Sequence, residues 1–161
     1  MKKQQTTTWL FLGVYIVLLA YFTLVDDTFG RNIFNIQNLN FDSLVNYMET
    51  SLNLIPFATI RLYINGLKSD NITLGLFLIN ILGNLLMLMP LSFFVPTLLK
   101  KVNTFLKFLV FVIVFSVCIE ILQILFLTGS CDIDDVMLNV LGACISYPIF
   151  SKLKKEEKKK G

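Results

Sequence analysis

Four long apolar runs separated by polar segments dominate the hydropathy pattern of this chain. They cover residues 9–25, 72–95, 105–127 and 134–150. Each run approaches the length of about 20 residues that an α-helix needs to cross the hydrocarbon core of a bilayer. The pattern therefore predicts an all-α fold, an integral membrane bundle of four transmembrane helices. Pro90 and Pro96 predict that the second helix kinks or ends near them.

The first run follows Lys2 and Lys3, as the core of a signal peptide would. It is longer than a usual signal core, and the residues after it offer no small-x-small cleavage site, so we expect an uncleaved transmembrane helix. Residues 1–150 are then expected to form a single transmembrane domain, which leaves no room for a separate catalytic domain. The lysine-rich residues 151–161 follow as a cytoplasmic tail.

The composition supports a membrane protein, since 55% of the residues are hydrophobic and 16% are charged, with a mean hydropathy of +0.72. The absence of histidine excludes His-based catalytic triads and the commonest metal ligand. The three cysteines offer neither an even-numbered disulfide framework nor a zinc-binding spacing, and no cofactor or metal is expected. The basic residues gather in a short tail instead of a folded basic face, so nucleic acid is not an expected partner.

The distribution of charge predicts how the helices are oriented. If the N-terminus is cytoplasmic, eleven of the fourteen basic residues lie on the cytoplasmic side: Lys2, Lys3, Lys100, Lys101, Lys107 and six lysines after residue 151. Arg31, Arg61 and Lys68 then lie outside, among eight acidic residues that include Asp26 and Asp27. This asymmetry follows the positive-inside rule. We therefore expect both termini to be cytoplasmic and residues 26–71 to form one larger outer loop.

Polar residues recur at helical spacing inside three of the four apolar runs. They are Asn80 and Asn84 in the second, Ser116, Glu120 and Gln123 in the third, and Asp135, Asn139 and Ser146 in the fourth. Residues spaced by three, four or seven positions share one face of a helix. Counted at the helical rise of about 1.5 Å per residue, the three faces converge in the outer half of the membrane. We therefore predict a polar pocket that opens outward, roofed by residues 53–57 and 130–135.

Glu120 carries the most weight among these residues, because an ionised carboxylate inside a bilayer costs several kcal/mol. It must be protonated, solvated or paired, and Arg61 in the outer loop is the nearest plausible cation. Two structural alternatives stay open. Glu120 is protonated and bonded to Gln123 or Asn139, or the amide residues only pack the helices together.

Three acidic residues, Asp132, Asp134 and Asp135, precede or begin the fourth run. Carboxylates are favoured in the first turn of a helix, where they cap free N–H groups and complement the helix dipole. Capping of the fourth helix is enough to explain two of the three acids. The alternative is a divalent cation held by the clustered carboxylates, but their spacing is not that of a full oxygen cage.

Four short motifs stand in order along residues 50–150. They are NLIPF at residues 53–57, Asn80 with Gly83 and Asn84, Glu120 with Gln123, and Asp132, Asp135 and Asn139 after them. This ordered set resembles the VanZ-like family of small bacterial membrane proteins. The resemblance implies a protein of the bacterial cytoplasmic membrane, whose namesake relatives are associated with resistance to glycopeptide antibiotics, teicoplanin above all. Family members often carry a basic residue before the acidic motif, where this chain reads Thr128-Gly-Ser-Cys131.

Two functions of different classes follow, and the non-enzymatic one is preferred. In it, the protein contributes to tolerance of teicoplanin-type antibiotics by binding a lipopeptide, a lipid-linked cell-wall precursor or a partner protein in the polar pocket. The residues expected to bind are Asn53, Arg61, Asn80, Asn84, Gln123, Asp132 and Asn139. The alternative is an intramembrane enzyme acting on a lipid-linked envelope substrate, with Glu120 as general acid or base and Asp135 steering the substrate or a metal. Membrane lipid is a partner in both cases, and a homo-oligomer stays open.

Overall fold

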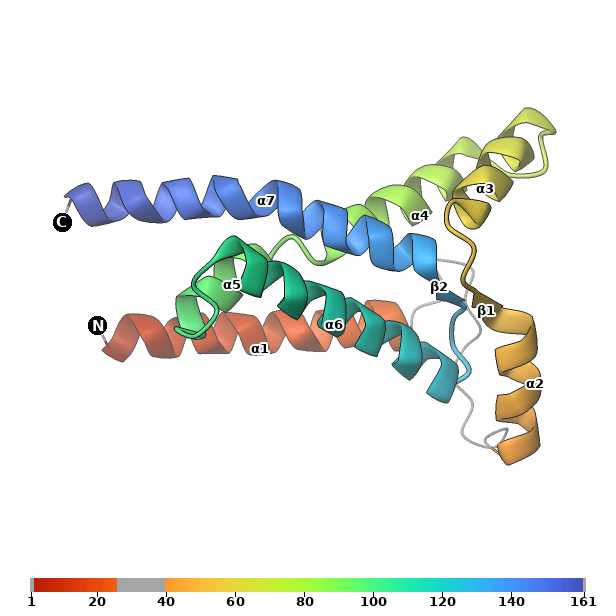
Figure 1. Ribbon diagram of the computed structural model, residues 1–161, viewed down its shortest axis with the longest axis horizontal. Helices are drawn as coiled ribbons and strands as arrows, with labels where there is room; N and C mark the ends of the chain where they lie inside the picture. The colour runs from red at the N-terminus through yellow and green to blue at the C-terminus, as the bar shows by residue number, and fades with distance from the viewer. Residues whose placement is uncertain (1, 26–39, 161) are drawn as a thin grey trace.

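The computed structural model describes residues 2–25 and 40–160 (Figure 1). Its helices are α1 (Lys2–Leu24), α2 (Phe41–Ser51), α3 (Ala58–Lys68), α4 (Leu74–Met87), α5 (Leu91–Leu98), α6 (Phe105–Leu125) and α7 (Ile133–Lys160). Two short strands are β1 (Leu52–Asn53) and β2 (Cys131–Asp132). Asp26, Asp27 and Arg31 of the predicted outer loop lie outside the described residues. So do the side chains of the tail beyond residue 153.

Four helical segments are long and apolar enough to cross a membrane. They are Gln5–Leu24, Leu74–Leu98, Phe105–Leu125 and Ile133–Leu153. The predicted set of four long apolar helices in a mostly helical fold is therefore confirmed. The second segment is interrupted, because α4 ends at Met87 and α5 begins directly after Pro90, as predicted. The beginning of α1 and the end of α7 lie at the same end of the bundle (Figure 1).

The other elements, α2, α3, β1 and β2, gather at the opposite end of the bundle, which we call the distal end (Figure 1). There, α2 lies across the long axis of the bundle. β1 pairs in parallel with β2, so that Leu52 is opposite Cys131 and Asn53 is opposite Asp132. This pairing brings the segment after α2 to the start of α7. The hydropathy pattern predicts only a loop over residues 26–71, because short amphipathic helices do not stand out as apolar runs.

Side-chain caps fix where several helices begin. Asn40 Oδ1 accepts a hydrogen bond from the Ser43 N–H at 2.7 Å, and the Ser43 hydroxyl accepts one from the Asn40 N–H at 3.1 Å. This reciprocal pair is a capping box at the start of α2. Thr73 and Thr104 cap α4 and α6 in the simpler way, each hydroxyl accepting one backbone N–H of the first turn.

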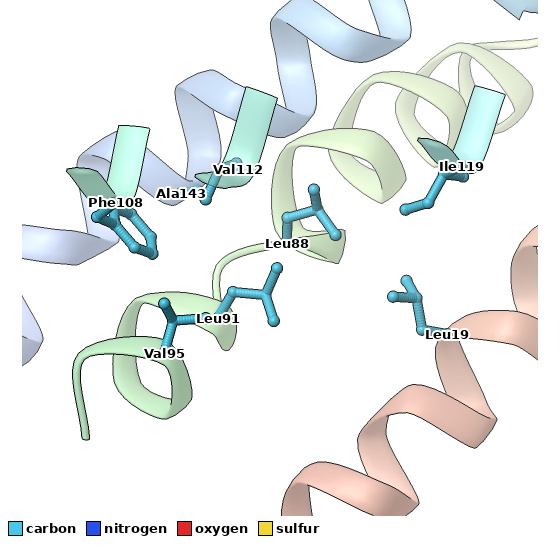
Figure 2. Packing of buried hydrophobic residues seen from close by; sticks show 8 residues of the cluster. All are labelled: Leu19, Leu88, Leu91, Val95, Phe108, Val112, Ile119 and Ala143. Atoms are coloured by element: carbon cyan, nitrogen blue, oxygen red, sulfur yellow. The ribbon is translucent and has the colours of Figure 1, made fainter. Parts of the chain in front are cut away.

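The core is built around α7, which packs against α4, α5 and α6. Buried apolar side chains connect these helices to α1 (Figure 2): Leu19, Leu88, Leu91, Val95, Phe108, Val112, Ile119 and Ala143. Gly142 permits a very close approach of α7 to α4, since a Cβ built on it would lie 1.7 Å from the carbonyl oxygen of Leu85. Small residues of this kind let helix backbones approach in membranes. The close approach sets the polar faces of α4 and α7 against each other.

Candidate functional site

Glu120 lies on the buried face of α6, near the end where α6 leads into the connection to α7. Its side chain is 2% exposed, and Oε2 accepts a hydrogen bond from the backbone N–H of Asp132 at 3.0 Å. Gln123 lies about one turn further along the same face, and its Nε2 donates to the Thr23 carbonyl of α1 at 3.2 Å. The polar face of the third span is therefore buried, and it joins α6 to α1 and to the start of α7.

Asp132 binds three other groups of the protein from the end of β2. Its Oδ1 accepts a hydrogen bond from the backbone N–H of Asp134 at 2.8 Å, so Asp132 caps α7. The Thr59 hydroxyl donates to Oδ2, and Asn53 Nδ2 lies 3.4 Å from the same oxygen. Asn53 Nδ2 also donates to the Thr59 hydroxyl at 2.9 Å. Asp132 thus ties the start of α7 to residues on both sides of Pro56.

Asp134 caps α3, a helix that is far from it in the sequence. Its fully buried carboxylate accepts the backbone N–H groups of Phe57 at 2.5 Å, Thr59 at 3.0 Å and Ile60 at 3.1 Å. Phe57 precedes α3 with a φ of 64° and supplies no capping side chain of its own. A carboxylate in this place also lies at the positive end of the α3 dipole.

The sequence predicts that these acids cap their own helix, and this is only partly correct. Asp132 does cap α7, but Asp134 is directed to α3 because the β1–β2 pair brings the N-terminus of α3 against the first turn of α7. Both carboxylates are therefore engaged by N–H or O–H donors. Among the described residues, no group of three acids or thiols could hold a metal ion.

A second set of contacts joins α4 to α7. The side-chain amide of Asn84 donates a hydrogen bond to Asp135 Oδ1. Asn84 and Asn139 are buried, with side chains 2% and 1% exposed, and Asn139 lies one turn beyond Asp135 on α7. Asn84 of the second span, Glu120 and Gln123 of the third and Asn139 of the fourth therefore point into the interior of the bundle.

Three buried oxygen atoms in this interior have no hydrogen-bond partner within the described part of the chain. They are Ser116 Oγ, Gln123 Oε1 and Asn139 Oδ1. Buried polar groups are nearly always bonded, and a buried water molecule commonly supplies the missing partner. Each of these oxygens can therefore accept a hydrogen bond from a water molecule, a protonated carboxyl or a polar ligand.

Two residues predicted to bind lie apart from this cluster. Asn80 Nδ2 donates to the Leu76 carbonyl of its own helix at 3.0 Å. Arg61 is exposed on α3, and no described side chain forms an ion pair with it. Arg61, the nearest plausible cation for Glu120 in the sequence, therefore does not pair with it, because α3 turns its backbone N–H groups toward the acids.

The two segments predicted to roof a polar pocket, residues 53–57 and 130–135, do meet at the distal end. The side chains beneath them are bonded to one another and to the backbone, so they form a hydrogen-bonded cluster. Among the described residues, open hollows lie between α1 and α5 and between α1 and α4.

Several residues of this end are not among the sequence-based candidates. Thr23 and Thr59 accept or donate hydrogen bonds in the cluster, and nothing in the sequence marks them. The Tyr47 hydroxyl donates to the Gly129 carbonyl at 3.0 Å and so holds α2 against the connection between α6 and α7. A Cβ on Gly129 would lie 3.0 Å from Cδ of Gln123. This glycine is therefore the one sequence feature that indicates tight packing in the connection between α6 and α7.

Cys131 lies beside the acids of the cluster and is outside the membrane-spanning segments. Burial raises the pKa of its thiol, and the charges of Glu120 and Asp132 raise the pKa further. A raised pKa leaves less of the reactive thiolate at neutral pH. The thiol therefore reports on the charge of the cluster around it.

Four helices that are long and apolar enough to cross a membrane, joined at one end by buried carboxylates and amides, define a class of small helical membrane protein with a buried acidic cluster. The sequence matches the VanZ/LLP1 family over residues 12–154, and the chain belongs to this family. It is similar to Protein VanZ of Enterococcus faecium, with 28% identity over 139 residues, which cover 86% of this chain and 70% of that protein. No solved structure matches the chain.

Proposed function

We propose that this membrane protein contributes to tolerance of teicoplanin-type glycopeptide antibiotics. In this proposal its distal end faces the cell exterior and binds a lipopeptide, a lipid-linked cell-wall precursor or a partner protein. The VanZ family supplies the association with these antibiotics. The excess of basic residues at the other end of the bundle supports the orientation.

The observation that carries the proposal is the cap that Asp134 places on α3. Three backbone hydrogen bonds of 2.5–3.1 Å hold the start of α3 against α7. They fix the loop before α3, whose Leu54, Ile55 and Phe57 side chains are 61%, 70% and 54% exposed. A fixed loop that presents apolar side chains beside polar groups suits an amphiphilic ligand at the membrane surface.

The alternative function is an intramembrane enzyme that uses Glu120 as general acid or base. The observation in its favour is the set of buried oxygens of Ser116, Gln123 and Asn139, which a polar substrate group could meet. Against it, Glu120 is 2% exposed and Oε2 already holds the Asp132 N–H. A general acid or base must reach the reacting proton within hydrogen-bond distance, directly or through one water. Binding is therefore the better-supported function.

The test is the inhibitory concentration of teicoplanin for a susceptible host that carries the wild type, a variant or an empty vector, with membrane levels compared by immunoblot. The variants are Asp134→Ala, Asn84→Ala, Glu120→Gln and, as a matched control one turn away on α4, Asn80→Ala. If the protein acts by binding, the wild type should raise the inhibitory concentration, the first three variants should each lose part of that rise, and Asn80→Ala should keep it. If the protein is an enzyme, Glu120→Gln alone should abolish the rise. No rise with the wild type at normal membrane level contradicts the proposal.

A further inference from the structure

An apolar groove runs between α1 and α5. α5 lies toward the end of the bundle that holds both termini (Figure 1). The groove has a volume of about 490 Å³. Its lining includes Thr7, Thr8, Phe11 and Val14 of α1 and Phe93 and Phe94 of α5. Phe11 and Val14 are 63% and 58% exposed, so the groove is open to the surroundings of the bundle. Because both helices belong to candidate membrane spans, those surroundings are lipid.

The groove has the direction and length of a single lipid chain. Its lining on α1 runs from Thr7 to Leu18, which corresponds to about 16 Å along a helix. Half of a hydrocarbon core of about 30 Å is a comparable distance. The ring of Tyr15 closes the groove on the inside, where it stacks on Phe94 with centroids 5.8 Å apart. Its hydroxyl is satisfied by the Met87 carbonyl at 2.7 Å, so the groove presents an apolar surface.

A second hollow continues the groove where the first candidate span begins and the second ends, and we call the two hollows together the seam. It is lined by Gln5 of α1 and by the end of α5 with the residues after it, among them Lys100 and Lys101, and has a volume of about 520 Å³. Gln5 precedes Thr7 by two residues, and Leu98 follows Phe94 by one helical turn, so the two hollows adjoin along α1 and α5. Both lysines are exposed, and none of the described residues that line this hollow is acidic.

We propose that this seam binds one anionic phospholipid of the bilayer. One of its two acyl chains lies in the groove between α1 and α5, and the phosphate lies in the second hollow against Lys100 and Lys101. An apolar channel that ends at two cations at the membrane surface matches an amphiphile with a negative headgroup in both shape and charge. The charge asymmetry of the sequence assigns this end, and hence the lipid, to the cytoplasmic leaflet. The proposal does not depend on the function of the distal end.

The experiment uses the full chain in nanodiscs that contain equal amounts of phosphatidylglycerol and phosphatidylcholine with identical acyl chains. Native mass spectrometry after release counts the lipids retained and identifies them. The headgroup is tested with the double variant Lys100→Gln/Lys101→Gln, against the control Lys107→Gln/Lys152→Gln, which removes two other exposed lysines of the same half of the chain. The groove between α1 and α5 is tested with Val14→Trp. The control is Val17→Trp, because Val17 is 69% exposed on the same helix but does not line the groove.

The wild type is expected to retain one phosphatidylglycerol in preference to phosphatidylcholine. Neutralising Lys100 and Lys101 should lower that preference by about fivefold for each lysine, and Val14→Trp should lower retention of both lipids, while the two controls behave as the wild type. Equal retention of the two lipids by the wild type would overturn the proposal, as would an equal loss in the control double variant. A wild-type dimer that Val14→Trp dissociates would assign the groove to a second copy of the chain and also overturn it. All the headgroup variants alter exposed side chains, so their result does not depend on a perturbed core.

Discussion

The backbone N–H of Asp132 donates a hydrogen bond of 3.0 Å to Oε2 of Glu120. The acid of the third span therefore binds the backbone just before α7 begins, at the point where β2 passes into the helix. An unbonded N–H at this buried place would cost free energy, and the carboxylate removes that cost. This gives Glu120 a positioning role in addition to any contact with a ligand.

The first prediction follows from that bond. Glu120→Gln keeps an acceptor oxygen at the same place, so we expect it to lower the free energy of unfolding by less than about 1 kcal/mol. Glu120→Leu leaves the Asp132 N–H buried without a partner and should cost about 1–3 kcal/mol. Reversible unfolding in mixed micelles with increasing SDS measures both. Equal costs for the two variants would contradict the positioning role.

The second prediction concerns the cap on α3. Asp134→Ala removes the acceptor for three backbone N–H groups, so we expect a loss of about 2 kcal/mol in stability. Hydrogen exchange should become faster at the amides of residues 57, 59 and 60, because their acceptor is gone. Glu49→Ala, which removes an exposed acid of α2, is the control and should leave those amides unchanged. Unaltered protection of α3 in Asp134→Ala would show that the cap contributes nothing.

The sequence alone predicts the membrane part of this fold well. The four apolar helices and the break after α4 follow from hydropathy and proline, and the buried faces of Glu120 with Gln123 and of Asn139 follow from helical spacing. These features depend on local sequence, which is why periodicity finds them.

The distal end could be predicted only in outline, because its contacts join residues that are far apart in the chain. Asp134 binds residues 74 or more positions away, and spacing along a helix cannot indicate such a partner. The sequence does not show where Arg61 lies on α3, so it suggests a counter-ion that the fold does not provide. Asn80 shares a helical spacing with Asn84, but its side chain bonds to its own helix. Thr59 carries no pattern at all, since a single hydroxyl in a segment predicted as a loop is ordinary.

The third prediction tests the contact of α4 with α7. Gly142→Ala places a Cβ against the Leu85 carbonyl, so the two helices must separate and stability should fall by about 1–3 kcal/mol. Gly13→Ala is the matched control in α1, where a Cβ would meet nothing within 4 Å. It should be neutral or stabilising by up to about 1 kcal/mol, the difference in helix propensity. A tolerated Gly142→Ala would mean that α4 and α7 are further apart than described.

The fourth prediction uses Cys131 to read the charge of Glu120. Burial, then the negative charges of Glu120 and Asp132, raise the pKa of the Cys131 thiol. In Glu120→Gln one of these charges is absent, so the pKa should fall and the rate of alkylation at neutral pH should rise. The rate is measured against pH with a maleimide, in a Cys118→Ser/Cys144→Ser background. A pH profile that does not move would indicate that Glu120 carries no charge in the folded protein.

The architecture of the distal end depends most on the joining of residues 52–60 to the start of α7, and one engineered cysteine tests this directly. Leu52 is the partner of the native Cys131 in the parallel β1–β2 pair, and neighbouring strands lie about 4.8 Å apart, a distance that suits a disulfide. In the same Cys118→Ser/Cys144→Ser background, Leu52→Cys oxidised in native membranes should form an intramolecular disulfide with Cys131, whereas Leu54→Cys, exposed and outside the pair, should not. If Leu52→Cys and Cys131 both react with a maleimide but form no disulfide, the distal end is not assembled as described.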